Sequence, residues 1–286
     1  MSVNVSAPAI TAAGATGWRR HAWIGVLAVG LALFLAVERT LVATQNPNMI
    51  PTTILLGAAV VPAAFVAFIS GRRLRYAVTG TVVAATAFFG GVIGLVVAGT
   101  LEFDAQHDLG GLPMIGVGLI EETSKLIVPL TILLFLRRYR TPADGLLIGV
   151  ASGAGFAAME TMGYAFTTLI ASRGSITDTV DELLLRGLLS PAGHMAWTGI
   201  AAAALYAAAA SSQRGRKVGE FVVAFLIAVG LHALWDSQHS LLGMAVVGTV
   251  SLALLAFAAH RCAVQVQQRR VPVAATEPLP RPDRRA

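Results

Sequence analysis

Two adjacent carboxylates and a lysine lie inside an apolar stretch that is long enough to cross a lipid bilayer. The stretch runs from about residue 112 to 136 and contains Glu121, Glu122 and Lys125. If all three ionised side chains faced lipid at mid-membrane, their insertion would cost roughly 8–10 kcal/mol. Helical spacing puts Lys125 one turn from both glutamates. We therefore expect a helix whose charged face is buried in protein, with Lys125 neutralising part of the glutamate pair.

The composition of the chain is that of a polytopic membrane protein. Hydrophobic residues make up 56% of the 286 residues and charged residues only 13%, and the mean hydropathy is +0.72. This balance excludes an ordinary soluble domain. The net charge is +6, but the basic residues flank apolar runs. The lipid bilayer, and not nucleic acid, is therefore the expected partner of the positive charge.

The distribution of apolar residues predicts an all-α membrane domain of about eight transmembrane helices. The apolar runs cover about residues 22–43, 50–70, 76–99, 112–136, 143–170, 190–210, 218–237 and 240–261. We expect a single helical domain over residues 21–262. It is preceded by a disordered tail at 1–20 and followed by a basic, Pro/Arg-rich tail at 263–286.

The charged loops support eight crossings. With eight spans, the loops that carry clustered Arg and Lys all fall on one side of the membrane together with both termini. Of the 21 Lys and Arg residues, 17 lie in these loops and at the termini, counting Arg261 at the end of the last run with the C-terminal tail; the others are Arg39, Lys125, Arg173 and Arg186. The positive-inside rule then predicts that both termini are cytoplasmic.

Two further runs carry polar residues at helical spacing. Phe156 and Glu160 share one face of the fifth run, and His232 and Asp236 share one face of the seventh. At about 1.5 Å per residue, these groups and the glutamate pair fall in the outer half of the membrane. We expect them to form one site there.

The sixth run begins Ser190-Pro191-Ala192-Gly193-His194. Ser190 is the expected N-cap and Pro191 the first helical residue, which puts His194 in the first turn. The helix dipole disfavours imidazolium there, so a neutral His194 suits a metal ligand, a base or a donor to an oxyanion. Arg186, in the preceding loop, is expected to anchor that loop or to contact substrate.

The fifth run also carries glycines at four-residue spacing, at positions 145, 149 and 153. Such a small-xxx-small face lets a neighbouring helix approach closely. Close packing is also what a buried site beside this helix would need.

The ordered motifs resemble those of a known family. Glu-Glu-x-x-Lys at 121–125, Phe-x-x-x-Glu at 156–160, Ser-Pro-x-Gly-His at 190–194 and His-x-x-x-Asp at 232–236 follow one another on successive runs. This pattern resembles the PrsW family of bacterial intramembrane proteases, which is related to the type II CAAX prenyl endopeptidases and, more remotely, to the APH-1 subunit of γ-secretase. The resemblance covers about residues 112–240, the expected catalytic core.

The resemblance implies a multi-pass protease of the bacterial cell membrane. The family's best-known activity is the first cut in a membrane-anchored anti-sigma factor, on its extracytoplasmic side, so a single-span protein of that kind is the implied substrate. CAAX endopeptidases have an Arg where this chain has Lys125 and a His where it has Glu160. These departures disfavour prenylated substrates.

The expected chemistry is peptide hydrolysis by an activated water. Glu121 or Glu122 would be the general base, and Lys125 would keep the other carboxylate ionised. His194, alone or with His232, would stabilise the oxyanion or protonate the leaving amine. Two versions remain open at this stage. In one, Zn²⁺ is bound by ligands drawn from Glu160, His194, His232 and Asp236; in the other, carboxylate and imidazole act without a metal.

Two other classes fit a buried polar cluster. A proton-coupled transporter would use the carboxylates as a relay, although the sequence shows no inverted repeat. A non-catalytic membrane assembly subunit, as APH-1 is, would not need both glutamates and both histidines. A scaffold would tolerate Glu122→Ala, whereas an enzyme would not.

Overall fold

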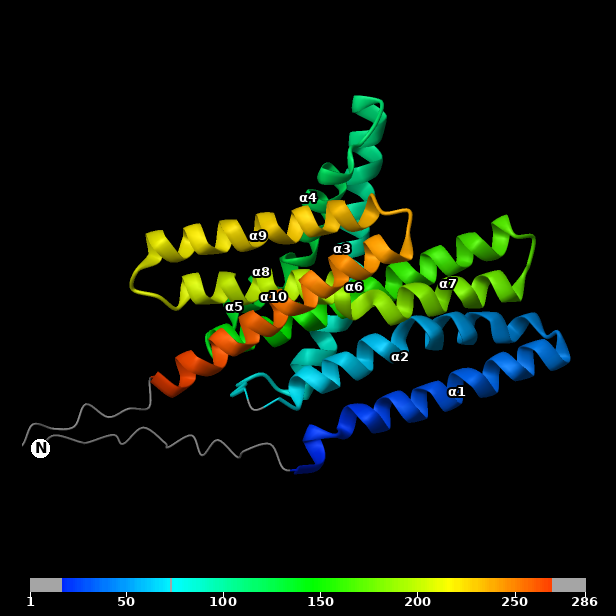
Figure 1. The fold of residues 1–286 in the computed structure, drawn as a ribbon, viewed down its shortest axis with the longest axis horizontal. Helices are drawn as coiled ribbons and strands as arrows, with labels where there is room; N and C mark the ends of the chain where they lie inside the picture. The colour runs from blue at the N-terminus through cyan, green and yellow to red at the C-terminus, as the bar shows by residue number, and fades with distance from the viewer. Residues whose placement is uncertain (1–16, 73, 269–286) are drawn as a thin grey trace, which may run out of the picture.

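The computed structural model describes residues 17–72 and 74–268, which contain helices and their connections and no strand. The α-helices are α1 (Ala22–Thr44), α2 (Ile50–Ser70), α3 (Gly80–Leu109), α4 (Met114–Lys125), α5 (Ile127–Phe135), α6 (Pro142–Ala171), α7 (Ile176–Leu189), α8 (His194–Ala209), α9 (Arg214–Asp236) and α10 (Leu241–Gln268). Short 3-10 turns are η1 (Gly17–Arg20), η2 (Pro47–Met49) and η3 (Ser190–Ala192). The predicted all-α fold is confirmed (Figure 1).

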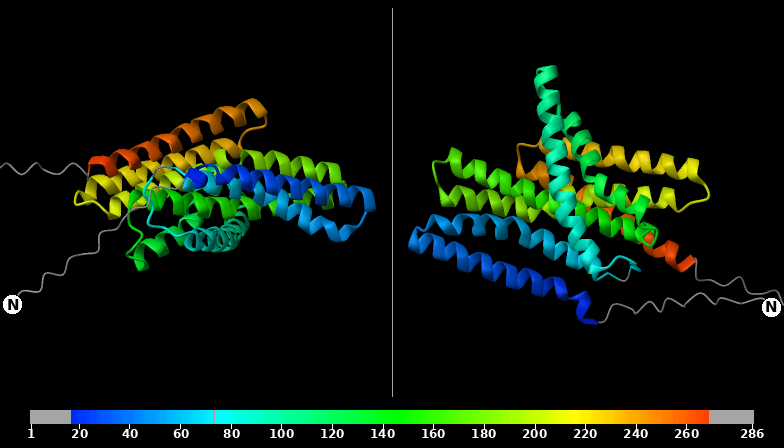
Figure 2. Two further views of the ribbon diagram at one scale, coloured as in Figure 1. Left: turned by 90° about the horizontal axis from the view of Figure 1, so that it is seen from below. Right: turned by 180° about the vertical axis from the view of Figure 1, so that it is seen from behind.

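Six helices are long and apolar enough to cross a membrane within the part of the chain that is described: α1, α2, α3, α6, α9 and α10. The protein is therefore a multi-pass membrane protein, as predicted. Of the other two predicted spans, the one at 112–136 is broken into α4 and α5, and the one at 190–210 contains η3 and the shorter helix α8, which α7 precedes. The first residues of α1 and the last residues of α10 lie toward the same end of the bundle (Figure 2). An even number of membrane crossings requires this arrangement.

Helix α6 is the centre of the bundle. In its most apolar window 78% of the residues are buried, against 11–33% in the other five candidate spans. It packs against α2, α3, α7 and α8. The predicted glycine face is confirmed: a Cβ added at Gly149 would lie 2.5 Å from the Thr198 carbonyl oxygen, and one at Gly153 would lie 2.4 Å from the His194 carbonyl oxygen. Because these glycines lack side chains, α8 and its first residue lie directly against α6.

The predicted fourth span is broken immediately after Lys125. Pro129 has no amide hydrogen to donate to the Lys125 carbonyl, and its ring disfavours a continuous helix at that point. Helix α4 ends at Lys125 and α5 begins at Ile127. The freed Lys125 carbonyl accepts a hydrogen bond from Ser152 Oγ of α6 at 2.7 Å. The break is thus satisfied by a neighbouring helix, which non-helical backbone inside a membrane requires.

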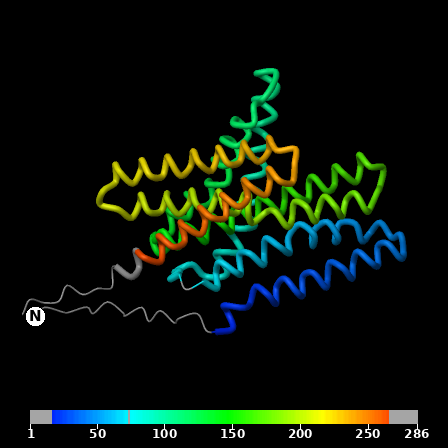
Figure 3. Tube along the Cα trace, viewed as in Figure 1, coloured from blue at the N-terminus to red at the C-terminus, as the bar shows by residue number. Residues whose placement is uncertain are grey.

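The region of the predicted span at 190–210 differs from the sequence prediction. Residues 176–189, expected as a loop, form α7, and α7 and α8 lie end to end beside α6 (Figure 1, Figure 3). Ser190 is not the N-cap of α8, because Gly193 holds that position and Ser190 Oγ donates instead to the Gly187 carbonyl. His194 is the first residue of α8, so its predicted place in the first turn is confirmed. The helix end that presents His194 is therefore within the bundle.

Helices α3 and α4 run across the direction of the other helices, and the turn between them projects from one side of the bundle (Figure 2). Helix α3 continues to Leu109, beyond the predicted end near residue 99. Helix α10 likewise continues to Gln268, past the start of the predicted tail at 263. The predicted tails otherwise lie outside the described residues, apart from the η1 turn at 17–20.

We predict that Gly149→Val destabilises the protein by about 1–3 kcal/mol, because the new side chain would overlap α8. The matched control is Gly163→Val on the same helix, where an added Cβ would meet nothing within 4 Å. Thermal unfolding of both purified variants in the same detergent would measure the difference. Equal melting temperatures would contradict this account of the α6–α8 contact.

Candidate active site

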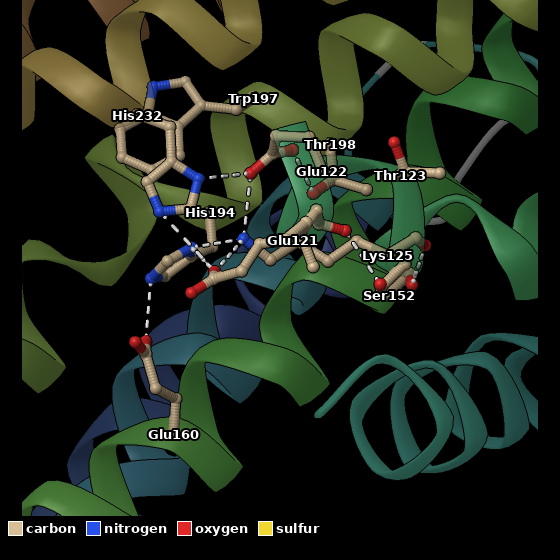
Figure 4. A network of polar contacts seen from close by, with 12 residues as sticks. Glu121, Glu122, Thr123, Lys125, Ser152, Glu160, His194, Trp197, Thr198 and His232 are labelled. Carbon is tan, nitrogen blue, oxygen red and sulfur yellow. Dashed lines mark hydrogen bonds and ion pairs between the residues drawn. The ribbon is translucent and has the colours of Figure 1, made fainter. Parts of the chain in front are cut away.

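The side chain of Lys125 is the centre of the polar cluster. It is fully buried, and its Nζ lies 2.9 Å from Glu121 Oε2 and 2.8 Å from Glu122 Oε1. Its third polar neighbour is His194 Nδ1 at 2.7 Å, and the Phe156 ring centroid is 4.2 Å away (Figure 4). A buried ammonium is tolerated only where such partners replace water. The predicted pairing of the lysine with both glutamates is present in this geometry.

Glu122 is fully buried and is contacted by side chains from three other residues. It is 0% exposed and, besides Lys125, contacts His232 Nδ1 at 3.0 Å. Thr198 Oγ1 donates to its other oxygen at 3.2 Å. Thr198 was not predicted from the sequence, although its spacing of four residues from His194 puts the two on one helix face. Glu122 is thereby shut off from water and oriented toward His232.

Glu121, His194 and His232 form the group that could hold a metal ion among the described residues. Each offers one ligand atom, and these atoms lie within 4.8 Å of one another. Glu121 Oε2 is 3.9 Å from His194 Nδ1 and 3.5 Å from His232 Nε2. Two imidazoles and one carboxylate are a donor set that catalytic zinc uses, with a fourth position left for water.

Of the two carboxylates predicted as metal ligands, Glu160 stands behind His194, whereas Asp236 lies at the same nitrogen of His232 that Glu121 faces. Glu160 Oε2 is 2.9 Å from His194 Nε2, on the side of the ring away from Glu121. Asp236 Oδ2 is 3.2 Å from His232 Nε2. The ligand group found in the structure therefore differs from the predicted one, since Glu121 takes the place expected for Glu160 or Asp236. The carboxylates behind the rings are Glu160 at His194 Nε2 and Glu122 at His232 Nδ1, and they fix each ring and its tautomer.

Trp197 supports one face of the His232 ring, and Ser251 in turn holds Trp197. The Trp197 ring stacks on His232 with centroids 4.7 Å apart and an interplanar angle of 23°. Trp197 Nε1 donates to Ser251 Oγ of α10 at 2.8 Å, and both residues are fully buried. Neither residue was predicted from the sequence, because a tryptophan and a serine in apolar runs carry no signal of their own.

A cavity of about 260 Å³ opens beside His194. Its polar lining includes Glu160, Glu182, Arg186 and Ser190, and Trp235 and Met244 are part of its apolar wall. Arg186 Nη2 pairs with Glu160 Oε2 at 2.9 Å. Its guanidinium also lies over the Tyr164 ring, 3.7 Å from the centroid. Arg186, left open by the sequence, thus ties α7 to α6 at the wall of this cavity.

Glu102 is a further acidic residue, located just beyond the predicted end of the third apolar run at about 99. Because α3 extends to Leu109, Glu102 lies within that helix. Its Oε1 is buried and has no hydrogen-bond partner among the described residues. Inside a membrane a carboxyl group in that state is costly, which marks it for functional testing.

All nine residues singled out from the sequence therefore belong to one connected network on α4, α6, α7, α8 and α9. They are Glu121, Glu122, Lys125, Phe156, Glu160, Arg186, His194, His232 and Asp236. A buried Glu/His cluster with a cavity beside it, inside a helical membrane domain, is the arrangement expected of an intramembrane hydrolase.

Comparison with known proteins gives the family. A model described as PrsW family intramembrane metalloprotease matches residues 51–260. The chain belongs to this family and is an intramembrane endopeptidase, which confirms the resemblance seen in the motifs. Neither the curated proteins nor the solved structures that were compared contain a match.

We predict that Lys125→Met destabilises the protein by about 3–5 kcal/mol, because it leaves two buried carboxylates without their cation. Lys217→Met is the control, since Lys217 pairs with the exposed Glu220 and its loss should cost about 1 kcal/mol or less. Thermal unfolding would measure both. A Lys125→Met variant that melts with the parent would show that this ion cluster does not hold α4 in place.

Proposed function

We propose that this protein cuts a single-span membrane protein, such as an anti-sigma factor, near the extracytoplasmic face of the bacterial cell membrane. The observation that supports this most is the buried group of Glu121, His194 and His232, with a cavity beginning at His194. Family membership supports peptide hydrolysis within the membrane. The substrate and the side of the cut are proposals that rest on the family's known activity and on the loop charges.

We further propose that Glu121, His194 and His232 bind a divalent metal ion, with Zn²⁺ the best match to the donor set. The fit is supported by the carboxylates behind the rings, Glu160 at His194 Nε2 and Glu122 at His232 Nδ1. Metal-binding histidines almost always have such partners. When bound, the ion would polarise the scissile carbonyl and lower the pKa of a bound water.

The chain's own groups would divide the remaining work. Glu160 lies at the cavity wall and would orient the His194 ring through the 2.9 Å contact between its Oε2 and His194 Nε2. Arg186 would hold Glu160 in that position through the 2.9 Å ion pair. Glu122 is fully buried and cannot meet substrate, so it would act as a positioning residue for His232. This assignment favours Glu121 over Glu122 as the glutamate in the reaction.

One contact supports the metal-free version. Lys125 Nζ is 2.7 Å from His194 Nδ1 and 2.9 Å from Glu121 Oε2, on the side where a metal ion would be held. A ring nitrogen uses one lone pair, so it can accept from an ammonium or bind a metal, but not both. In this version Glu121 would be the general base and His194 the oxyanion donor, with Lys125 as the permanent cation.

We predict that Glu121→Gln, His194→Ala and His232→Ala each lower cleavage of a single-span reporter by the purified protein at least about 100-fold. If the site binds a metal ion, elemental analysis should show that these variants have lost bound zinc. A strong chelator should then also inactivate the parent. Asp178→Asn, at the exposed start of α7, is the control that should cleave normally. Variants that cleave like the parent would contradict the site.

We predict that the reporter is cut on its extracytoplasmic side, because the arginine-rich loops put the cluster in the outer half of the membrane. Cells expressing the parent or Glu121→Gln, with a reporter tagged at both ends, would show the position of the cut by the masses of the two fragments. Fragments that end on the cytoplasmic side would overturn the proposed orientation.

A further inference from the structure

A second cavity, of about 270 Å³, lies between α1 and α2, separate from the candidate active site. We call it the α1–α2 pocket. Its walls include Trp23, Leu27, Val61, Ala64, Phe65 and Phe68. The aromatic residues form one continuous surface, since Trp23 meets Phe68 edge-on at 5.8 Å and Phe65 stacks on Phe68 at 5.8 Å. A cavity lined in this way takes an apolar chain.

Arg72 and the segment that carries Arg19 and Arg20 lie together next to Phe68, a residue of the α1–α2 pocket. The Arg72 guanidinium lies over the Phe68 ring, 3.8 Å from its centroid, and Arg19 and Arg20 belong to the η1 turn that precedes α1 and Trp23. The two segments touch, because a Cβ added at Gly71 would lie 2.5 Å from the Arg19 carbonyl oxygen. Within residues 17–72 and 74–268, none of these arginines forms an ion pair with a carboxylate. The positive charge next to Phe68 is therefore available to an external anion.

We propose that the α1–α2 pocket binds an anionic phospholipid, with one acyl chain along Phe65 and Phe68 and the phosphate among Arg19, Arg20 and Arg72. The apolar walls suit the chain, and the arginines suit the phosphate. A zwitterionic lipid fills the same walls but carries its own cation beside the phosphate. The chemistry of the site therefore favours a net negative headgroup on the side where the basic loops lie.

The α1–α2 pocket also touches the turn that leads into the candidate active site. Pro191 is part of its lining, and Pro191 belongs to the η3 turn that leads into His194. A bound acyl chain would support this turn from outside. The lipid would then order the segment that presents His194, although its binding does not depend on the protein being a protease.

The test is native mass spectrometry of the purified full-length protein with equimolar phosphatidylglycerol and phosphatidylcholine of identical acyl chains. We expect the parent to retain phosphatidylglycerol in preference to phosphatidylcholine. The triple variant Arg19→Gln, Arg20→Gln, Arg72→Gln should lose this preference by about tenfold or more. Ala64→Phe fills the apolar end and should reduce retention of both lipids, whereas Ala28→Phe, on the exposed face of α1, should not.

The matched charge control neutralises a different arginine cluster on the same predicted side. Arg137, Arg138 and Arg140 are all exposed and do not line the α1–α2 pocket. Changing these three to Gln should leave the preference for phosphatidylglycerol intact. Equal retention of the two lipids by the parent, or an equal loss in both triple variants, would show only general attraction to negative charge and would overturn the proposal.

Discussion

The burial of the Lys125 ammonium is the constraint on which the rest of the structure depends. A charge in the interior of a membrane protein must be matched by charged or polar partners, because neither lipid nor apolar side chains can replace its hydration. Glu121 and Glu122 come from the same helix turn, but His194 must come from another helix. Satisfying one lysine therefore brings α4 against α8, and the site is assembled by the same contacts that neutralise it.

Both helices that meet at the site are broken where they meet. Pro129 frees the Lys125 carbonyl, and Ser152 of α6 satisfies it. The break before α8 places the first turn of that helix, with His194, inside the bundle. Broken helices are also found in transporters, although this sequence shows no inverted repeat. In this chain they serve to bring polar side chains to one point beside a cavity, and family membership establishes the enzyme.

The membrane fold and most of the residues that form the site could be predicted from the sequence. Charge is so costly in lipid that each buried ionisable residue must have a partner. Glu121, Glu160 and His232 could therefore each be recognised as candidate site residues from the sequence. Thr198, Trp197 and Ser251 were not visible in this way, since neutral residues in apolar runs carry no comparable cost. The glycine face of α6 was also visible, because its regular spacing has few explanations other than close helix packing.

The amino-acid sequence alone determined the class of fold, the approximate spans, and the residues that must be shielded from lipid. These follow from the transfer cost of charge and from the length that a helix needs to cross a bilayer. Only the tertiary structure decided how the shielded residues pair. Sequence spacing relates groups on one helix, whereas Glu121 meets His194 and His232 through the packing of α4, α8 and α9. Spacing along the chain does not encode those distances, so the group that could bind a metal emerged only from the assembled helices.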